Sequence, residues 1–357
     1  MLKARLGLTT LACVGLAIAI STTSATAWKR GAVQTFALLP SGDPMVEGLT
    51  VGKDGKVYSP TFNPAGSAPS LIFTFDPQGH LLNHVQIQNS SPAMLGLAFY
   101  PNTDILLVID FGKAQVLSVN PETGQSSVCI TLPPGNAFPT AGLNALTFDA
   151  AGNIYISDSF QGIIWRHSPL QGPAFCGPGT QATIWVQDDL LKPNNGVPGF
   201  GANGIEFNKK GDAMFVANTA MDWIVKIPVT NGPSGAMPSG QPELFTNSIN
   251  GADGIAIDSN DNIWVAANQA DEIVVVDHTG KAIAKLGDFE GVSGGVTDGL
   301  LFPASPAFSK DGNWLYVTNL ELDLRTIGGP QTVDSQWAAE VTRHSIARLK
   351  ARIPPIQ

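Results

Sequence analysis

DGIAIDSNDNIWVAAN, residues 253–268, is the stretch that decides the fold. Two apolar runs, 254–257 and 263–267, flank a short segment of Ser, Asn and Asp. The apolar runs are rich in Ile, Val and Trp, which suit a pleated, half-buried strand, while Asn and Asp tolerate the positive φ angles of a tight turn. The stretch therefore predicts a β-hairpin that begins at Asp253.

The same pattern recurs along the chain. NALTFDAAGNIYISD at residues 144–158 and NGIEFNKKGDAMFVAN at residues 203–218 are clear copies, and weaker ones begin at Glu47, Leu95 and Ala304. Further strand-like runs follow, as in EIVVV at 272–276 and AIAKL at 282–286. The copies start ~50 residues apart, the spacing of a propeller blade. The one longer interval contains a Pro/Gly-rich segment, 192–200.

Six such units predict an all-β protein, a six-bladed β-propeller with four-stranded antiparallel blades. We expect it to form a single domain over residues 28–357, closed by pairing of residues 33–38 with the last blade near 345–353. A β-sandwich is the alternative fold, but near-equal spacing disfavours it. The net charge of −9 with no basic cluster argues against a nucleic-acid partner.

The N-terminus has the pattern of a secretory signal peptide. Lys3 and Arg5 precede an apolar run over residues 6–20, and Ala25-Thr26-Ala27 resembles a cleavage site. We expect residues 1–27 to be removed and the protein to be exported, periplasmic or secreted, with no membrane span in the rest. An uncleaved anchor is less favoured because the run is short. Export permits a disulfide between Cys129 and Cys176, and two buried free thiols are the alternative.

The first residues of the six units should meet at one end of the central channel. Four of them carry side-chain oxygens: Glu47, Asn144, Asn203 and Asp253. Carboxylate and amide oxygens suit a hard cation, so we predict that these four residues bind one divalent metal, with calcium the favoured ion. Each Asn-Gly or Asp-Gly pair alone is more typical of a turn. Their shared position in the repeat favours the metal site.

The segments that begin at these four residues resemble motifs of the gluconolactonase/senescence-marker-protein (regucalcin-like) family of calcium-dependent six-bladed propellers. The resemblance implies that Glu47, Asn144, Asn203 and Asp253 bind calcium and that Asp253 is also the general base or nucleophile. Two positions depart from family patterns. Gly142 stands where sugar-lactone members have a substrate-binding Arg, and Ala256 stands where a second calcium site needs Asp.

We therefore expect a calcium-dependent hydrolase of a small-molecule ester, lactone or phosphoester, with Asp253 as the catalytic residue. A non-catalytic, metal-stabilised binding or scaffold propeller is the alternative, and a metal-free lyase is disfavoured by the oxygen-rich axial set. Loops 136–142, 192–200 and 289–303 should shape the channel mouth. Phe138, Phe200 and Phe302 are candidates for its apolar wall.

Overall fold

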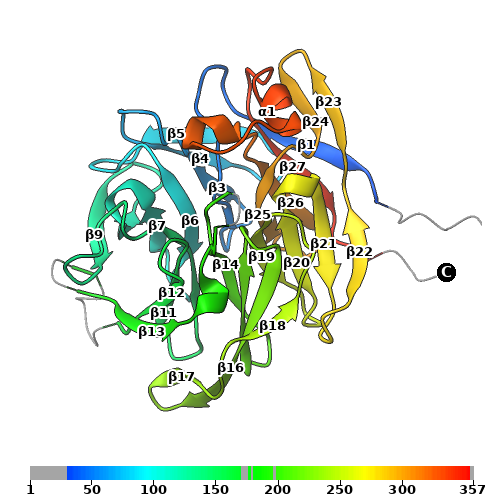
Figure 1. Ribbon diagram of the computed structural model, residues 1–357. Coiled ribbons are helices and arrows are strands. Elements are labelled where there is room, and N and C mark those ends of the chain that lie inside the picture. Colours follow the sequence, from blue (N-terminus) through cyan, green and yellow to red (C-terminus); the bar gives the residue numbers. More distant parts are fainter. Residues whose placement is uncertain (1–29, 170–175, 178–179, 196–197, 354–357) are drawn as a thin grey trace, which may run out of the picture.

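The computed structural model describes residues 30–169, 176–177, 180–195 and 198–353. Six antiparallel sheets follow one another along the chain and form a six-bladed β-propeller, as the sequence predicts (Figure 1). The predicted signal peptide, residues 1–27, lies outside the described residues. Among the described residues, no helix is long and apolar enough to cross a membrane.

Each blade has an inner strand at the channel and three strands that lead outward. The first three blades comprise β2 (Thr50–Val51), β3 (Val57–Pro60), β4 (Leu71–Phe75) and β5 (Leu81–Gln86); β6 (Met94–Phe99), β7 (Leu106–Asp110), β8 (Gln115–Val119) and β9 (Ser126–Thr131); and β10 (Leu143–Phe148), β11 (Ile154–Asp158), β12 (Ile163–His167) and β13 (Thr183–Gln187). Short 3-10 helices η1 (Phe111–Lys113) and η2 (Asp189–Leu191) lie in their connections.

The last three blades contain the insertions. They comprise β14 (Ala202–Phe207), β15 (Ala213–Asn218), β16 (Trp223–Gly232), β17 (Gly235–Pro238) and β18 (Glu243–Thr246); β19 (Ala252–Ile257), β20 (Ile263–Ala267), β21 (Glu272–Val276) and β22 (Ala282–Leu286); and β25 (Pro303–Phe308), β26 (Trp314–Asn319), β27 (Ser345–Lys350) and β1 (Val33–Leu38). The fourth blade thus has a fifth strand, β17, on an extension of β16. A further 3-10 helix, η3 (Asn268–Ala270), follows β20.

Middle strands are buried on both faces because a neighbouring blade covers each face. In β20 and β21 every residue is buried, and the alternation of apolar and polar residues disappears accordingly. The outer strands β5 and β13 keep exposed positions along their length. The core therefore lies between the blades, in layers that repeat around the channel.

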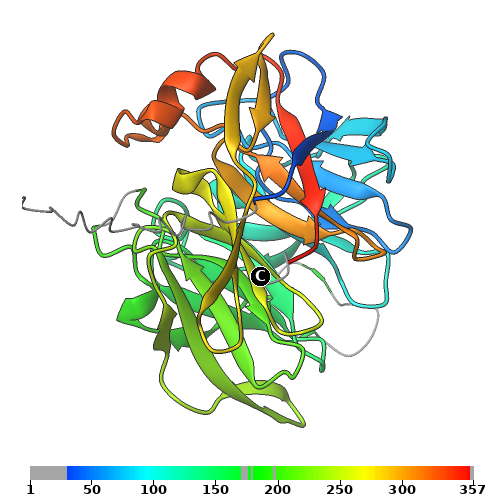
Figure 2. The ribbon, with the colours of Figure 1, turned by 90° about the vertical axis from the view of Figure 1, so that its right-hand side faces the viewer.

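The predicted closure is confirmed. β1 pairs antiparallel with β27, with Val33 opposite Leu349 and Leu38 opposite Ser345. The two strands, blue and red, lie side by side in Figure 2. The last blade thus combines both ends of the chain, so the hydrogen bonds between β1 and β27 hold the ring of blades closed.

Two features differ from or extend the expectations. The segment 289–303, expected to be a loop, contains a hairpin formed by β23 (Phe289–Ser293) and β24 (Val296–Gly299). A second insertion, residues 320–344, contains η4 (Leu324–Ile327) and the helix α1 (Val333–Ala338), and it stands out in red-orange at one end of the molecule in Figure 2.

The two cysteines that remain after residue 27 are joined. Cys129 in β9 forms a disulfide with Cys176, which lies in the connection between β12 and β13. Of the two alternatives left open by the sequence, the structure has the disulfide. It ties the second blade to the long connection of the third.

Candidate functional site

The four predicted ligands meet in one small cavity at the channel axis. Its volume is about 40 Å³, enough for an ion or a water molecule. The lining consists of Glu47, Phe62, Leu95, Asn144, Pro198, Phe200, Asn203, Thr219, Asp253, Asn268, Phe302, Leu320, Leu322 and Ile327. Glu47, Asn144, Asn203 and Asp253, the axial residues predicted from the repeat, are all buried. We call this space the axial cavity.

A bulge in the inner strand presents the axial side chain in blades two to six, whereas Glu47 of the first blade lies just before β2. In blades two to six the pairing register shifts between the first and fourth residues of the inner strand, as between Ala252 and Ile255 in β19. The axial residue, Asp253 in that case, is the second residue of the strand. A bulge leaves a residue outside the ladder and re-aims its side chain. The repeated bulge therefore explains why residues from separate blades point to one place.

The glycines after the axial residues serve close packing and not turns. Asn203-Gly204 lies inside β14 and Asp253-Gly254 inside β19, so the turn interpretation of these pairs is wrong. A Cβ on Gly204 would come within 2.5 Å of the Asp253 backbone oxygen, and one on Gly254 within 2.6 Å of the Ala304 oxygen. Only glycine lets adjacent inner strands approach this closely.

Hydroxyl groups of a neighbouring blade hold the backbone at or next to the axial residues. The Thr318 hydroxyl donates to the Glu47 carbonyl oxygen at 2.6 Å, and the Ser157 hydroxyl donates to that of Asn203 at 2.6 Å. The Thr219 hydroxyl donates to the carbonyl oxygen of Ala252, the residue before Asp253, at 2.8 Å. These bonds cross between blades, so the axial side chains are held by the closed ring and not by one hairpin alone.

Three buried oxygens in the axial cavity have no hydrogen-bond partner. They are Glu47 Oε2, Asp253 Oδ1 and Asn268 Oδ1. Buried polar atoms are normally paired, so three unpaired acceptors in one cavity of this size are informative. All are acceptors that a cation would satisfy. The donor set that could hold a hard cation is thus two carboxylates and the amides of Asn144, Asn203 and Asn268.

Asn268 was missed by sequence reasoning. It lies at the start of η3, directly after β20, and its amide nitrogen donates to Asp253 Oδ2 at 2.9 Å. Comparison of the repeats contains a signal for it. Blades two, three, four and six end their second strand with Asp or Asn, whereas blade five ends it with Ala267 and places Asn one residue later. That shift of one residue moves the amide to the axial cavity.

Burial and mutual repulsion disfavour charge on the two carboxylates in the metal-free site. Burial raises the pKa of Asp253 to about 7, although the hydrogen bond from Asn268 opposes the shift. Burial and the charge of Asp253 raise the pKa of Glu47 well above its ordinary value. A bound dication would offset both effects. The described residues contain no group of three or more His, Cys, Asp and Glu side chains suited to a metal, so the amides are essential to this donor set.

An apolar cover closes the axial cavity. Leu320, Leu322 and Ile327 come from the insertion after β26, and Phe200 and Phe302 come from two other loops. Of the three phenylalanines predicted as a wall, Phe200 and Phe302 line the cavity. Phe138 does not; it is 42% exposed and contacts Phe111 with ring centroids 5.1 Å apart.

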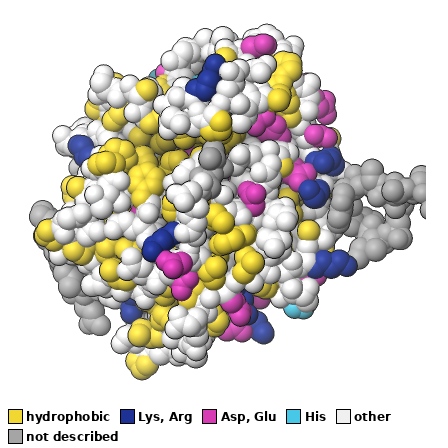
Figure 3. Space-filling view, in the orientation of Figure 1, with side chains coloured by type: hydrophobic (Ala, Val, Ile, Leu, Met, Phe, Trp, Pro, Cys, Tyr) yellow, Lys and Arg dark blue, Asp and Glu magenta, His cyan; other side chains and the backbone are white. Residues whose placement is uncertain are grey.

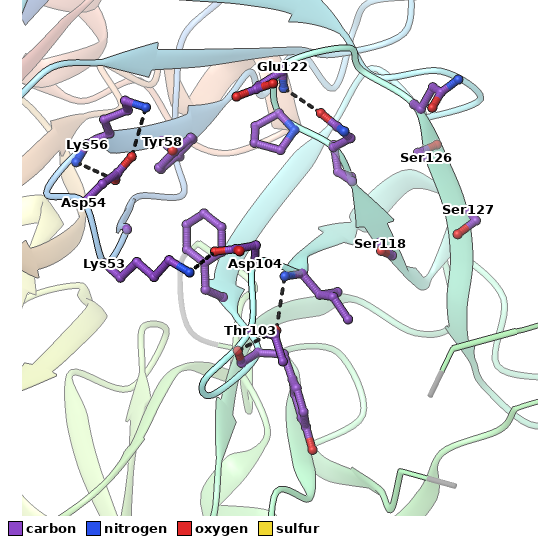
Figure 4. A pocket seen from close by; sticks show the side chains of 18 of the residues that line it. Lys53, Asp54, Lys56, Tyr58, Thr103, Asp104, Ser118, Glu122, Ser126 and Ser127 are labelled. Atoms are coloured by element: carbon purple, nitrogen blue, oxygen red, sulfur yellow. Dashed lines mark hydrogen bonds and ion pairs between the residues drawn. The ribbon is translucent and has the colours of Figure 1, made fainter. Parts of the chain in front are cut away.

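A much larger cleft lies elsewhere, between the first two blades. Its volume is about 1100 Å³, and its lining shares no residue with the axial cavity. Lys53 Nζ lies 2.6 Å from Asp104 Oδ1 across it, and Lys56 Nζ lies 2.9 Å from Asp54 Oδ2 (Figure 4). Four of the five charged side chains that line it thus form two ion pairs, and we do not take it as the candidate site.

Comparisons with known proteins agree with the fold and identify a family. The family model described as SMP-30/Gluconolactonase/LRE-like region matches residues 88–287. Lactonase drp35 of Staphylococcus aureus (strain MW2) is 24% identical over 185 residues, 51% of this chain and 52% of that protein. The chain thus aligns with about half the length of this curated relative.

Solved structures share the fold at low identity. Regucalcin from Agrobacterium tumefaciens, a calcium-binding protein, matches with a TM-score of 0.59 and 18% identity, over 90% of this chain and 97% of its own. A luciferin-regenerating enzyme matches with a TM-score of 0.60 and 14% identity, over 89% and 95% of the two chains. At these identities the likeness concerns the fold alone.

Proposed function

This chain belongs to the SMP-30/gluconolactonase/LRE-like family, and from that premise we propose that it is a calcium-dependent hydrolase of esters, lactones or phosphoesters. The observation that carries the proposal is the set of unpaired, buried oxygens of Glu47, Asp253 and Asn268 in one axial cavity. The drp35 lactonase relative supports a hydrolytic reaction. The substrate is a small molecule that reaches the cavity from the channel mouth.

We propose that Glu47, Asn144, Asn203, Asp253 and Asn268 hold the metal. When bound, the ion supplies Lewis-acid polarisation of the scissile group. Asp253 takes a proton through Oδ1 from the water that attacks the acyl carbon or phosphorus, and returns it to the alcohol oxygen as the ester bond breaks. Alternatively, its carboxylate attacks that atom and expels the alcohol, and water then hydrolyses the acyl or phosphoryl group from Asp253. In both routes the Asn268 amide keeps Oδ2 in place. The apolar cover excludes bulk water from this step.

Turnover with and without metal tests the proposal. The purified protein is analysed for its metal content and then assayed on aryl esters, lactones and paraoxon, before and after treatment with a chelator. We expect hydrolysis of one of these classes, its loss on chelation and its recovery with Ca²⁺. Asp253→Asn should abolish it while the circular dichroism spectrum stays unchanged. Turnover that survives both treatments would contradict the proposal.

A non-catalytic propeller with a structural metal is a second candidate, because the axial cavity has room for an ion but not for a substrate. Under this alternative, Ca²⁺ raises the thermal stability and no compound of the panel is turned over. Under the hydrolase proposal, the cover must move to admit the substrate. The two candidates therefore differ in turnover and agree in metal binding, which makes the turnover assay the decisive one.

We further propose that the protein is exported. The Cys129–Cys176 disulfide supports an oxidising compartment, and the pattern of residues 1–27 supports cleavage before Trp28. N-terminal sequencing of the protein recovered outside the cytoplasm of its host tests this. A mature protein that begins at residue 1 in the cytoplasmic fraction would contradict it.

A further inference from the structure

The wall above the axial oxygens is apolar. Apart from the donor residues and Thr219, every residue that lines the cavity is aliphatic, aromatic or Pro. The Thr219 hydroxyl is already used, since it accepts from the Asn203 amide and donates to the Ala252 carbonyl oxygen. A substrate bound against this wall would find few free partners for hydroxyl groups, and buried hydroxyls without partners oppose binding.

Gly142, two residues before Asn144, lies where a longer polar side chain cannot be accommodated. A Cβ added to Gly142 would lie 2.7 Å from the Phe160 ring, so a longer side chain there cannot be placed without moving that ring. Phe160 contacts Phe200 of the cavity wall, with ring centroids 5.5 Å apart. An aromatic ring thus occupies the space that a polar substrate-binding side chain at residue 142 would need.

A series of contacting aromatic rings extends from the cavity wall to the surface. Phe138, at the exposed end, contacts Phe111, and Phe111 contacts Phe160 with ring centroids 5.8 Å apart. Phe160 in turn contacts Phe200, which lines the axial cavity. Figure 3 shows hydrophobic side chains gathered on the face where the deep-orange η4 segment of Figure 1 lies. The apolar wall of the axial cavity is therefore continuous with a packed aromatic cluster that reaches the surface at Phe138.

The backbone of the cover is anchored by hydrogen bonds: the Leu320 N–H donates to the Phe302 carbonyl oxygen at 3.1 Å and the Glu321 N–H to that of Leu301 at 3.2 Å. The Arg325 side chain and the Thr326 hydroxyl both bond to Asp323, and Asp323 also bonds to Ser335, within the same insertion. Towards the axis, the cover presents Leu322 and Ile327. Displacing these side chains breaks apolar contacts, and an apolar ligand restores them.

From these observations we infer that the axial site takes substrates whose non-reacting part is apolar, alkyl or aryl esters and alkyl-substituted lactones, and discriminates against polyhydroxylated lactones. The ester group lies at the axial oxygens, and the apolar part replaces Leu322 and Ile327 against Phe200 and Phe302. This inference rests on the proposed function for the identity of the reacting group.

Chain length tests the inference in the calcium-loaded protein. We expect kcat/KM for p-nitrophenyl acetate, butyrate and hexanoate to rise about fourfold for each methylene that the wall buries. A lactone with an alkyl substituent should react at least about tenfold faster than gluconolactone. Equal rates along the ester series, or a preference for gluconolactone, would overturn the inference while leaving a hydrolase in place.

Measuring the binding of unreactive compounds tests the inference independently of turnover. Cyclohexanones with alkyl tails of increasing length carry a ring and a carbonyl but no ester bond, so they bind without reacting. Calorimetry should give a Kd that falls about fourfold per added methylene, with no detectable binding of a polyhydroxylated cyclohexanone. If the alkyl series does not bind, the inference is wrong. If it binds but no ester is hydrolysed, the proposed reaction is wrong and the apolar site stands.

A pair of variants locates the site. Leu322→Asn places an amide in the cover, and Leu82→Asn makes the same change on the exposed strand β5. We expect Leu322→Asn to abolish the chain-length dependence and Leu82→Asn to keep it. Phe200→Ala, in a half-buried loop position, repeats the test should Leu322→Asn not fold. Unchanged chain-length dependence in both wall variants would overturn the assignment.

Discussion

The axial cavity and the cleft between the first two blades are opposites. The cleft is more than twenty times larger, about 1100 Å³ against about 40 Å³, and its charged side chains at Lys53, Asp104, Asp54 and Lys56 form ion pairs in water. The axial cavity is small and buried, and three of its side-chain oxygens have no hydrogen-bond partner. A buried acceptor without a partner is stabilised by a bound cation, whereas the charges of a solvated ion pair already stabilise one another. The unpaired buried oxygens, and not the size of the cavity, therefore identify the candidate site.

Removing an axial carboxylate should have the largest effect. Glu47→Gln and Asp253→Asn each take one negative charge from a buried donor set, so we expect Ca²⁺ affinity to fall at least ~100-fold, since even outer partners of metal ligands cost 10–100-fold. Isothermal titration calorimetry measures it. Asp104→Asn in the cleft is the matched control and should leave the affinity unchanged. A Glu47→Gln protein that binds calcium normally would refute the axial site.

The second effect concerns Asn268, which the structure adds to the site. Asn268→Ala removes an unpaired oxygen and the hydrogen bond to Asp253, and we expect about a tenfold loss of Ca²⁺ affinity. Asn218→Ala is the control, because Asn218 ends the equivalent strand in the fourth blade and donates to the carbonyl oxygens of Leu190 and Lys192. It should lower the free energy of unfolding by about 1–3 kcal/mol without changing the affinity.

The same titration decides between a donor and a structural role for Asn268. If Asn268→Ala and Asn218→Ala both lose only stability, Asn268 is not part of the metal site. If only Asn268→Ala loses affinity, the shift of one residue between the blades has a functional consequence.

The next largest effect is the pH dependence of Ca²⁺ binding at the axial cavity. The pKa of Asp253 is raised from 3.8 to about 7 without metal, so below about pH 7 calcium must displace a proton. We expect affinity to fall as the pH is lowered from about 8 to about 6, and titrations in buffers of different ionisation enthalpy to show proton release at about pH 6. Asp253→Asn should release fewer protons. Affinity independent of pH over this window would contradict the assignment.

The stability of the metal-free protein should change in the opposite sense. Between about pH 4 and about pH 7 the folded state retains a proton on Asp253 that the unfolded chain releases, so the unfolded state binds fewer protons. Stability therefore falls as the pH rises through that window, and Ca²⁺ should restore it. Denaturant unfolding with and without calcium measures this. A metal-free protein that gains stability from Asp253 over this window would count against the raised pKa.

The smallest effect is expected in the cleft. Lys53 and Asp104 are both more than 70% exposed, so Lys53→Met and Asp104→Asn should each change the free energy of unfolding by no more than about 1 kcal/mol. Calcium binding and turnover should stay as in the wild type. A large loss of activity in either variant would show that the cleft contributes to function and would overturn the ranking of the two regions.

Much of this protein was determined by local sequence patterns. The hairpin phrases fixed strand, turn and strand in each unit, and their spacing fixed six blades and the shared position of Glu47, Asn144, Asn203 and Asp253. These features could be predicted because a strand pattern, a turn and a period are properties of neighbouring residues. The predicted pairing of the first strand with the last blade followed from the need to close the ring.

Only the tertiary structure decided what surrounds those four residues. The apolar cover of Leu320, Leu322 and Ile327 and the partner of Cys129 depend on contacts between segments far apart in the chain. Asn268 lies only 15 residues from Asp253, but its side chain has a role only at the axis that the six blades form together. The glycines after the axial residues looked like turn formers, because sequence shows their conformational freedom but not the neighbouring strand that leaves no room for a Cβ. Local patterns set the backbone of each blade, but burial and pairing at the axis arise only when all six blades close around it.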